Sequence, residues 1–210
     1  MTGALAVSIL AYDGIEPIDV GATFGVLSMA RRVAPGIAPH VAAPAREVEM
    51  ANGLRLIADH RLAEAPRADV AVVLGGPGWV RAAEDADLLA HLRALGAAGT
   101  VLAAVCTGGM VLAAAGQLDG RRATTKREIL AGEARPLDLL AARGGVEAVE
   151  ARIVDDGDVI TGGGVSLGHD LTLHLIRRFL GEAAFAETAR ILEYDRAFAA
   201  NAAALPDLAR

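Results

Sequence analysis

The sequence contains a single cysteine, Cys106, among its 210 residues. One thiol cannot form an internal disulfide, and it cannot supply the several thiolates of a structural zinc site. Aromatic residues make up only 3% of the chain, which argues against a surface that stacks nucleic-acid bases. We therefore expect no structural metal, and a core built mainly from aliphatic side chains.

An excess of positive charge and long apolar segments are also missing. The chain has 20 Lys and Arg residues against 26 Asp and Glu residues, whereas nucleic-acid binders usually carry a basic surface. Hydrophobic residues reach 53%, but Arg, Asp, His or Gly interrupts each apolar run before it reaches bilayer length. The N-terminus lacks the basic segment of a secretion signal. These features predict a cytoplasmic protein with a small-molecule partner, and neither nucleic acid nor a membrane.

Strand and helix patterns alternate along the chain. Strands, expected from short runs of aliphatic residues, lie at 4–11, 40–43, 68–74 and 100–105, and hairpins at 48–57 and 146–161. Helices are expected at 19–32, 85–98, 110–115, 127–143 with a break before Pro136, 165–180 and 182–194, before an Ala-rich C-terminal tail at 194–210. This alternation predicts one α/β domain over 1–210, with a mostly parallel sheet covered by helices on both faces.

Ligands in such folds bind at the carboxyl ends of strands, and Cys106 lies at one of these ends. Gly108 and Gly109 follow it and allow a sharp strand-to-helix turn, as in a nucleophile elbow. A thiol at a helix start faces the positive end of the helix dipole, which favours the reactive thiolate. The alternative is a buried cysteine that only packs.

Other candidates surround this turn. Thr107 could orient the thiol or a water molecule through its hydroxyl, or it could only bond its own helix turn. Gly75, Gly76 and Gly78 follow the strand at 68–74 and could present backbone N–H groups to an anion, together with Gly108. A Gly-Pro-Gly loop can equally be a simple tight turn.

Two carboxylates and one histidine could join the thiol. Asp19 lies at the start of a helix, where a carboxylate commonly only stabilises the first turn. Glu16 could likewise be an ordinary solvated charge in a loop. Either would stand beside the thiol if the first strand and the fourth, which precedes Cys106, are neighbours. His169 follows a Gly-rich turn and could reach the site, although packing or capping is the default for it. Its spacing from His174 is not that of a helical metal pair.

Four segments together resemble the ThiJ/PfpI superfamily, relatives of the class I glutamine amidotransferases. The segments lie at 75–78, 104–109, 121–125 and 162–170. Within this superfamily, the Cys-Thr-Gly turn at 106–108 and the residues at 18–21 and 192–195 look most like isonitrile hydratases, the cyclohexyl-isocyanide hydratases. The resemblance spans nearly the whole chain. It implies a flavodoxin-like three-layer sandwich, a homodimer, a cysteine nucleophile and no cofactor.

The resemblance also implies an activity. In isonitrile hydratases an Asp takes the place of Asp19 and a Thr that of Thr107, whereas branches that act on glyoxal-type aldehydes carry Glu near that position. Asp19 together with Cys106 and Thr107 therefore favours hydration of isonitriles to N-substituted formamides through a cysteine thioimidate. The alternatives are a glyoxalase or deglycase acting on 2-oxoaldehydes, and a non-catalytic sensor in which the thiol is oxidised or binds a ligand.

The chain also departs from its relatives. Many of them carry His where this chain has Lys126, so a Cys–His dyad is not predicted. Shortly after Asp19 stand Ala22, Thr23 and Gly25, where the hydratases tend to show Gly-Pro and an acidic residue. A late His-x-Glu pair is missing, so the amidotransferase triad is not expected. Related domains occur fused to helix-turn-helix regulators, but neither the length nor the charge predicts such a module here.

Overall fold

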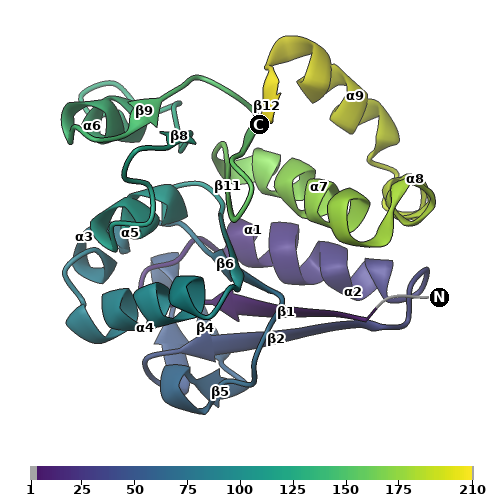
Figure 1. Ribbon diagram of the computed structural model, residues 1–210, viewed down its shortest axis with the longest axis horizontal. Coiled ribbons are helices and arrows are strands. Elements are labelled where there is room, and N and C mark those ends of the chain that lie inside the picture. Colours follow the sequence, from purple (N-terminus) through teal and green to yellow (C-terminus); the bar gives the residue numbers. More distant parts are fainter. Residues whose placement is uncertain (1–3, 210) are drawn as a thin grey trace.

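A central eight-stranded sheet organises the computed structural model, which describes residues 4–209 (Figure 1). The strand order is β12-β10-β11-β7-β6-β1-β2-β5, and every pair is parallel except β10 with β11. The strands are β1 Leu5–Leu10, β2 Ile37–Ala43, β5 His60–Arg61, β6 Val70–Val73, β7 Val101–Ala104, β10 Ile153–Asp155, β11 Val159–Gly162 and β12 Asp207–Ala209. The central strands are buried on both faces, which explains why they consist of uninterrupted aliphatic residues.

Helices cover both faces of this sheet. One group contains α1 Pro17–Val20, α2 Val26–Ala30, α7 Gly168–Leu180, α8 Glu182–Ile191 and α9 Asp195–Ala204; the other contains α3 Trp79–Ala82, α4 Ala86–Ala97, α5 Gly108–Ala114 and α6 Pro136–Ala142. In the first group α2, α7 and α8 pack against one another, and in the second α5 contacts α3, α4 and α6. The architecture confirms the predicted α/β, flavodoxin-like sandwich. Among residues 4–209, no helix has the length and hydrophobicity needed to cross a membrane.

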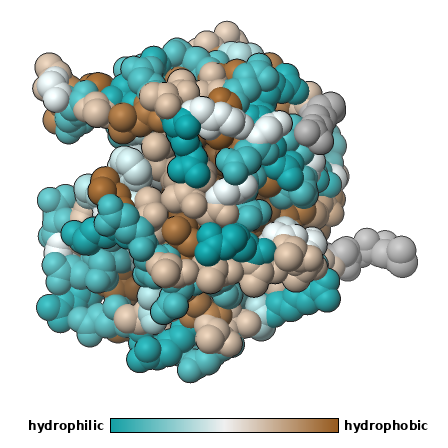
Figure 2. Space-filling view, turned by 60° about the vertical axis from the view of Figure 1, so that its left-hand side comes forward, coloured by the Kyte–Doolittle hydropathy of each residue, from teal (hydrophilic) through white to brown (hydrophobic). Residues whose placement is uncertain are grey.

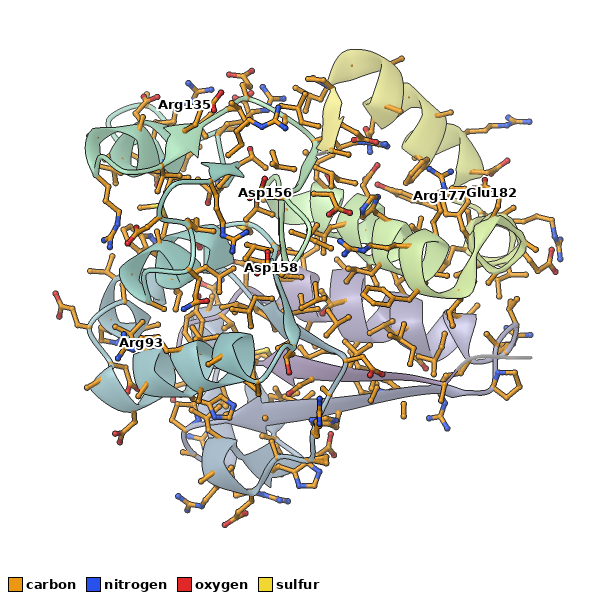
Figure 3. The ribbon with its side chains drawn as sticks, viewed as in Figure 1. Arg93, Arg135, Asp156, Asp158, Arg177 and Glu182 are labelled. Atoms are coloured by element: carbon orange, nitrogen blue, oxygen red, sulfur yellow. The ribbon has the colours of Figure 1, made fainter. Side chains whose placement is uncertain are left out.

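Local signals in the sequence account for several elements. Asn52 and Gly53 adopt φ values of 62° and 82° in the turn between β3 Glu47–Glu49 and β4 Arg55–Ile57, which pair as the predicted hairpin. Asp85 caps α4, because its carboxylate accepts hydrogen bonds from two backbone N–H groups of the first turn. Arg177 and Glu182 point toward each other in Figure 3 and pair at 2.9 Å across the turn between α7 and α8.

Two predicted elements are wrong in extent. The helix expected over 127–143 is present only as α6, because residues 127–135 run irregularly through Gly132, whose φ is +91°, and Pro136 opens the helix. The hairpin expected over 146–161 is formed only by β10 and β11. Its first part, β9 Glu147–Ala148, pairs instead with β8 Arg122–Ala123 in a separate parallel pair.

The C-terminal tail takes part in the fold as far as residue 209, since it forms α9 and the edge strand β12. Arg152, whose side chain is 1% exposed, fixes this segment: it pairs with Asp170 of α7 at 2.9 Å, binds Asp207 of β12 and donates to the Phe198 carbonyl oxygen of α9. A charge buried to this degree requires such partners. Removal of Arg152 would leave the buried carboxylate of Asp170 without its positive partner.

Candidate active site

Cys106 occupies a strained turn between β7 and α5. Its φ is +52°, a left-handed value that is uncommon for residues other than glycine. The backbone of Cys106 is held from both sides, since its N–H donates to the Gly163 carbonyl oxygen at 3.1 Å and its carbonyl accepts from Thr125 Oγ1 at 2.7 Å. A side chain at Gly108 would come within 2.3 Å of the Val73 carbonyl oxygen, so the turn requires glycine there. This is the sharp turn that the Cys-Thr-Gly-Gly pattern predicts.

Asp19 lies in the first turn of α1 with its side chain completely buried. Its Oδ2 atom accepts a hydrogen bond from the Gly75 N–H at 2.9 Å, and the carboxyl interacts with the Cys106 thiol. The assumption that the first and fourth strands are neighbours is wrong, because β6 lies between β1 and β7. Asp19 nevertheless meets the thiol, because α1 carries it to the loop that follows β6.

Burial controls the protonation of this pair. Burial is the largest cause, and together with the nearby charge of Glu16 it outweighs the hydrogen bond from Gly75 and raises the pKa of Asp19 to about 7. Burial likewise raises the pKa of Cys106 to about 11, with Asp19 adding to the shift. The prediction that the helix start favours the thiolate is therefore wrong for the resting site, since desolvation and the neighbouring carboxylate outweigh the backbone dipoles. The two groups titrate as a coupled pair that keeps its last proton at neutral pH.

The glycine loop after β6 positions the acid and the threonine. Gly75 N–H donates to Asp19, Gly76 N–H donates to Thr107 Oγ1 at 2.8 Å, and Gly78 N–H donates to the Gly14 carbonyl oxygen at 3.0 Å. The Thr107 hydroxyl in turn donates to the Gly76 carbonyl oxygen at 3.1 Å. Gly108 N–H is likewise engaged within its own turn, by the Val105 carbonyl oxygen. These N–H groups hold the site together, whereas the Thr107 N–H interacts with the thiol.

Gly76→Ala is expected to lower the free energy of unfolding by about 3 kcal/mol or more. Gly76 has a φ of +145°, and a Cβ there would lie 2.4 Å from both the Gly14 carbonyl oxygen and the Glu16 nitrogen. Urea denaturation measures the change, with Gly25→Ala as the matched control. Gly25 has helical angles and open space around it, so alanine there should stabilise the protein by about 0.5–1 kcal/mol. Equal effects at the two positions would contradict this account.

A cavity of about 650 Å³ opens onto the thiol. It is lined by Glu16, Ile18, Gly76, Pro77, Trp79, Cys106, Thr107, Lys126, Ile129, Glu133, Ala134, Pro136 and Val165. The segment that ends in α6 supplies one part of the wall, and the loop before α3 another. Figure 2 shows the molecule hollowed on the side where α3, α5 and α6 lie, with hydrophobic side chains bordering the hollow. The wall is mainly apolar, which suits an uncharged organic substituent.

The structure separates the two secondary candidates. Glu16 lines the cavity and is half-buried, with its N–H bonded to the Gly75 carbonyl oxygen at 2.8 Å. His169 is not part of the cavity wall: its Nδ1 lies 3.0 Å from the Ser166 carbonyl oxygen, and its ring stacks on that of Tyr194 with the centroids 5.1 Å apart. Across residues 4–209, no group of three or more His, Cys, Asp or Glu side chains is arranged to hold a metal ion.

Two residues of the site, Val165 and Lys126, are not among the predicted site residues. The backbone N–H of Val165 interacts with the Cys106 sulfur, and the charge of Lys126 lowers the pKa of that thiol. No pattern in the sequence indicates that the residue after Gly163 and Gly164 turns its N–H toward the cysteine. Lys126 was visible only as a departure from the histidine of many relatives.

The fold and the site together define a class of protein: an α/β sandwich with a buried cysteine on a strained strand-to-helix turn beside a buried carboxylic acid. The chain belongs to the DJ-1/PfpI family, whose model matches residues 6–178.

Relatives within this family differ in what they do. The chain is 31% identical to the isonitrile hydratase of Pseudomonas putida over 93% of its own length and 79% of that protein. It is 32% identical to the HTH-type transcriptional regulator GbdR of Pseudomonas aeruginosa, but over only 39% of the regulator. Among solved structures, a ThiJ/PfpI family protein from Pseudomonas syringae superposes with a TM-score of 0.79 at 28% identity, over 92% of this chain and 76% of that one. Membership of the family therefore does not by itself decide between enzyme and regulator.

Proposed function

We propose that the protein is a cofactor-independent isonitrile hydratase, which converts isonitriles to N-substituted formamides. The observation that carries this proposal is the buried Asp19–Cys106 pair, in which the cysteine lines a largely apolar cavity and the carboxyl group lies behind it. An isonitrile has an apolar substituent and a terminal carbon that must receive both a nucleophile and a proton. A thiol beside a carboxyl group with a pKa of about 7 can supply both. The similarity to the hydratase of Pseudomonas putida supports the same assignment.

The first step forms a thioimidate. The carboxylate of Asp19 takes the proton of the Cys106 thiol, and the sulfur attacks the terminal carbon of the isonitrile, so that the C–S bond forms. The carbon's remaining electron pair then accepts the proton from Asp19. The product is an S-linked N-substituted thioimidate, and Asp19 is again a carboxylate. Thr107 forms two hydrogen bonds with Gly76. It thereby fixes the position of the cysteine turn relative to the glycine loop during this transfer.

The second step hydrolyses the thioimidate. Asp19 takes a proton from water as the water oxygen adds to the thioimidate carbon, and it returns that proton to the nitrogen. The tetrahedral adduct collapses when the C–S bond breaks and the hydroxyl proton passes through Asp19 to the leaving sulfur. The formamide is released and the thiol is restored, so one water is consumed per turnover and no redox partner is required.

The direct test is an assay for formamide with cyclohexyl isonitrile and an aromatic isonitrile, read by liquid chromatography and mass spectrometry. We expect catalytic turnover and, on rapid quenching, an intact-mass adduct equal to one isonitrile. Lack of formamide with every isonitrile would overturn the proposal. Turnover of 2-oxoaldehydes in its place would identify a glyoxalase or deglycase, and selective peroxide oxidation of Cys106 without any turnover would indicate a sensor. The homodimer and the cytoplasmic location stay predictions, and size-exclusion chromatography checks the former.

The pH dependence of kcat/KM should follow the coupled pair. The reactive form holds one proton between Asp19 and Cys106, whether it is written as thiol and carboxylate or as thiolate and carboxylic acid. Activity should therefore rise through pH about 7, as the doubly protonated pair loses a proton, and fall near pH about 11, as the second proton leaves. Initial rates at low isonitrile concentration measure this profile. A flat profile across neutral pH would contradict a role for Asp19.

A further inference from the structure

The ionisable groups around Cys106 are mostly acidic. Tyr12 interacts electrostatically with the cysteine from the end of β1, Asp19 does so from α1, and Glu16 and Glu133 line the cavity. Each of these groups, when ionised, opposes negative charge on the sulfur. The nucleophile must nevertheless become an anion during the reaction. Asp19 is neutral once it has taken the thiol proton, so a positive group in the site has to offset the charges of Glu16 and Glu133.

A second strained residue lies against the sulfur. Val165 has a φ of +57°, which is an outlier for a β-branched side chain and costs of order 1–3 kcal/mol. Its loop is tied to the nucleophile by the Cys106 N–H, which donates to the Gly163 carbonyl oxygen. In this conformation the Val165 N–H interacts with the sulfur. Strain of this kind persists only where the surrounding structure holds the backbone in place.

Lys126 packs on the Val165 loop. A Cβ at Gly164 would lie 2.8 Å from Lys126 Cγ and 3.2 Å from Lys126 Cα, so the lysine stem lies directly over this glycine. The preceding residue, Thr125, donates its hydroxyl to the Cys106 carbonyl oxygen. Lys126 and Val165 also line a second cavity, of about 340 Å³, beside the first. The lysine therefore forms part of the wall between the two cavities. It packs against the loop whose N–H group faces the sulfur.

We propose that Lys126 is a positioning residue that, together with the strained Val165 N–H, forms an anion-stabilising wall for the Cys106 sulfur. Its ammonium group, which also donates to the Glu128 carbonyl oxygen, offsets the charges of the glutamates in the cavity wall, and its stem lies over the loop at 163–165 that faces the nucleophile. Of the residues that line the catalytic cavity, Lys126 is the one that carries a positive charge. The effect of its charge on the Cys106 pKa agrees with this geometry. The inference rests on the proposed function only in taking Cys106 as the nucleophile.

The test measures the thiol directly and needs no turnover. Because the chain has one cysteine, alkylation by iodoacetamide followed by intact mass reports on Cys106 alone. We expect Lys126→Met to lower the alkylation rate by about 3- to 10-fold at any fixed pH below the thiol pKa, by shifting the whole profile to higher pH. Lys126→Arg, which keeps the charge, should restore most of the rate.

Arg127→Met is the matched control. This substitution also removes a positive charge, from the residue next to Lys126. The guanidinium of Arg127, however, pairs with Glu128 and Glu150, and Arg127 does not line the catalytic cavity. Its alkylation profile should coincide with that of the wild type. Superimposable profiles for Lys126→Met and wild type, or an equal shift in Arg127→Met, would overturn the proposal. Lys126→Gln provides a second test if the methionine variant is poorly folded. A wild type without formamide formation would refute the proposed activity but leave this result standing.

Discussion

Cys106→Ala is expected to abolish formamide formation, with a fall in kcat/KM of at least about 10⁴-fold. The reason is chemical: the C–S bond divides the hydration into two accessible steps, and neither a methyl group nor the neighbouring carboxyl can replace the sulfur. Residual hydration would have to come from Asp19 acting on water alone. The adduct on the intact protein should disappear together with the activity, since no other thiol is present. Mass spectrometry of the quenched reaction and the formamide assay together measure both effects.

Cys106→Ser separates loss of the nucleophile from loss of packing. A serine hydroxyl fits the same buried position, which is only 3% exposed, but it ionises far less readily than a thiol. Both variants should stay folded, with thermal midpoints within a few degrees of the wild type, and both should be inactive. Wild-type turnover in Cys106→Ala would remove the thiol from the mechanism. Activity in Cys106→Ser but not in Cys106→Ala would show that a hydroxyl group can replace the thiol as the nucleophile.

Much of the fold follows from local signals in the sequence. The strands of the sheet centre are aliphatic because both of their faces are buried, and the Asn52-Gly53 turn and the Asp85 cap mark their elements plainly. The errors lie where tertiary contacts override local preference. Residues 127–135 have a helix-compatible composition, but three of them line the cavity, and Arg135, visible in Figure 3 beside α6, pairs with Glu150 at 2.6 Å. The part of the tail that the structure describes, residues 194–209, is held by the distant Arg152.

The candidate site divides in the same way. Cys106 and Thr107 could be named as candidates, because glycines at fixed offsets reveal the sharp turn. Asp19 could be named as a candidate, but its protonation depends on complete burial and on a hydrogen bond to Gly75, a residue 56 positions away. The left-handed backbone of Val165 has no sequence signal, because valine is among the residues least suited to it. Long-range geometry therefore decides how the site works, whereas local pattern decides only where it lies.

Asp19→Asn is expected to lower kcat/KM by about 10²- to 10⁴-fold and to remove the rise in activity near pH 7. The amide can still accept the hydrogen bond from the Gly75 N–H, so the side chain should stay in place. It cannot take the thiol proton or deliver one to the isonitrile carbon. Glu16→Gln is the matched control, because Glu16 lines the cavity but is half-buried and does not bond the thiol. The kcat/KM of Glu16→Gln should fall far less than that of Asp19→Asn.

The same substitution should make the protein more stable above neutral pH. In the folded protein the pKa of Asp19 is raised from 3.8 to about 7, so between these values the folded state binds a proton that the unfolded state releases. Stability contributed by this group is therefore present at low pH and declines as the pH rises from about 4 to about 7. Above pH 7 the buried carboxylate costs up to about 4 kcal/mol, and asparagine does not incur this cost.

Urea denaturation of wild type and Asp19→Asn at pH 4.5, 6 and 8 tests this linkage, because the other titrating groups are common to both proteins and cancel in the difference. The gain in unfolding free energy should be small at the lowest pH and should grow steadily toward pH 8. A gain independent of pH would mean that Asp19 keeps an ordinary pKa in the folded state. An inactive but more stable variant would instead show that the fold tolerates an unfavourable buried carboxyl because catalysis requires its proton.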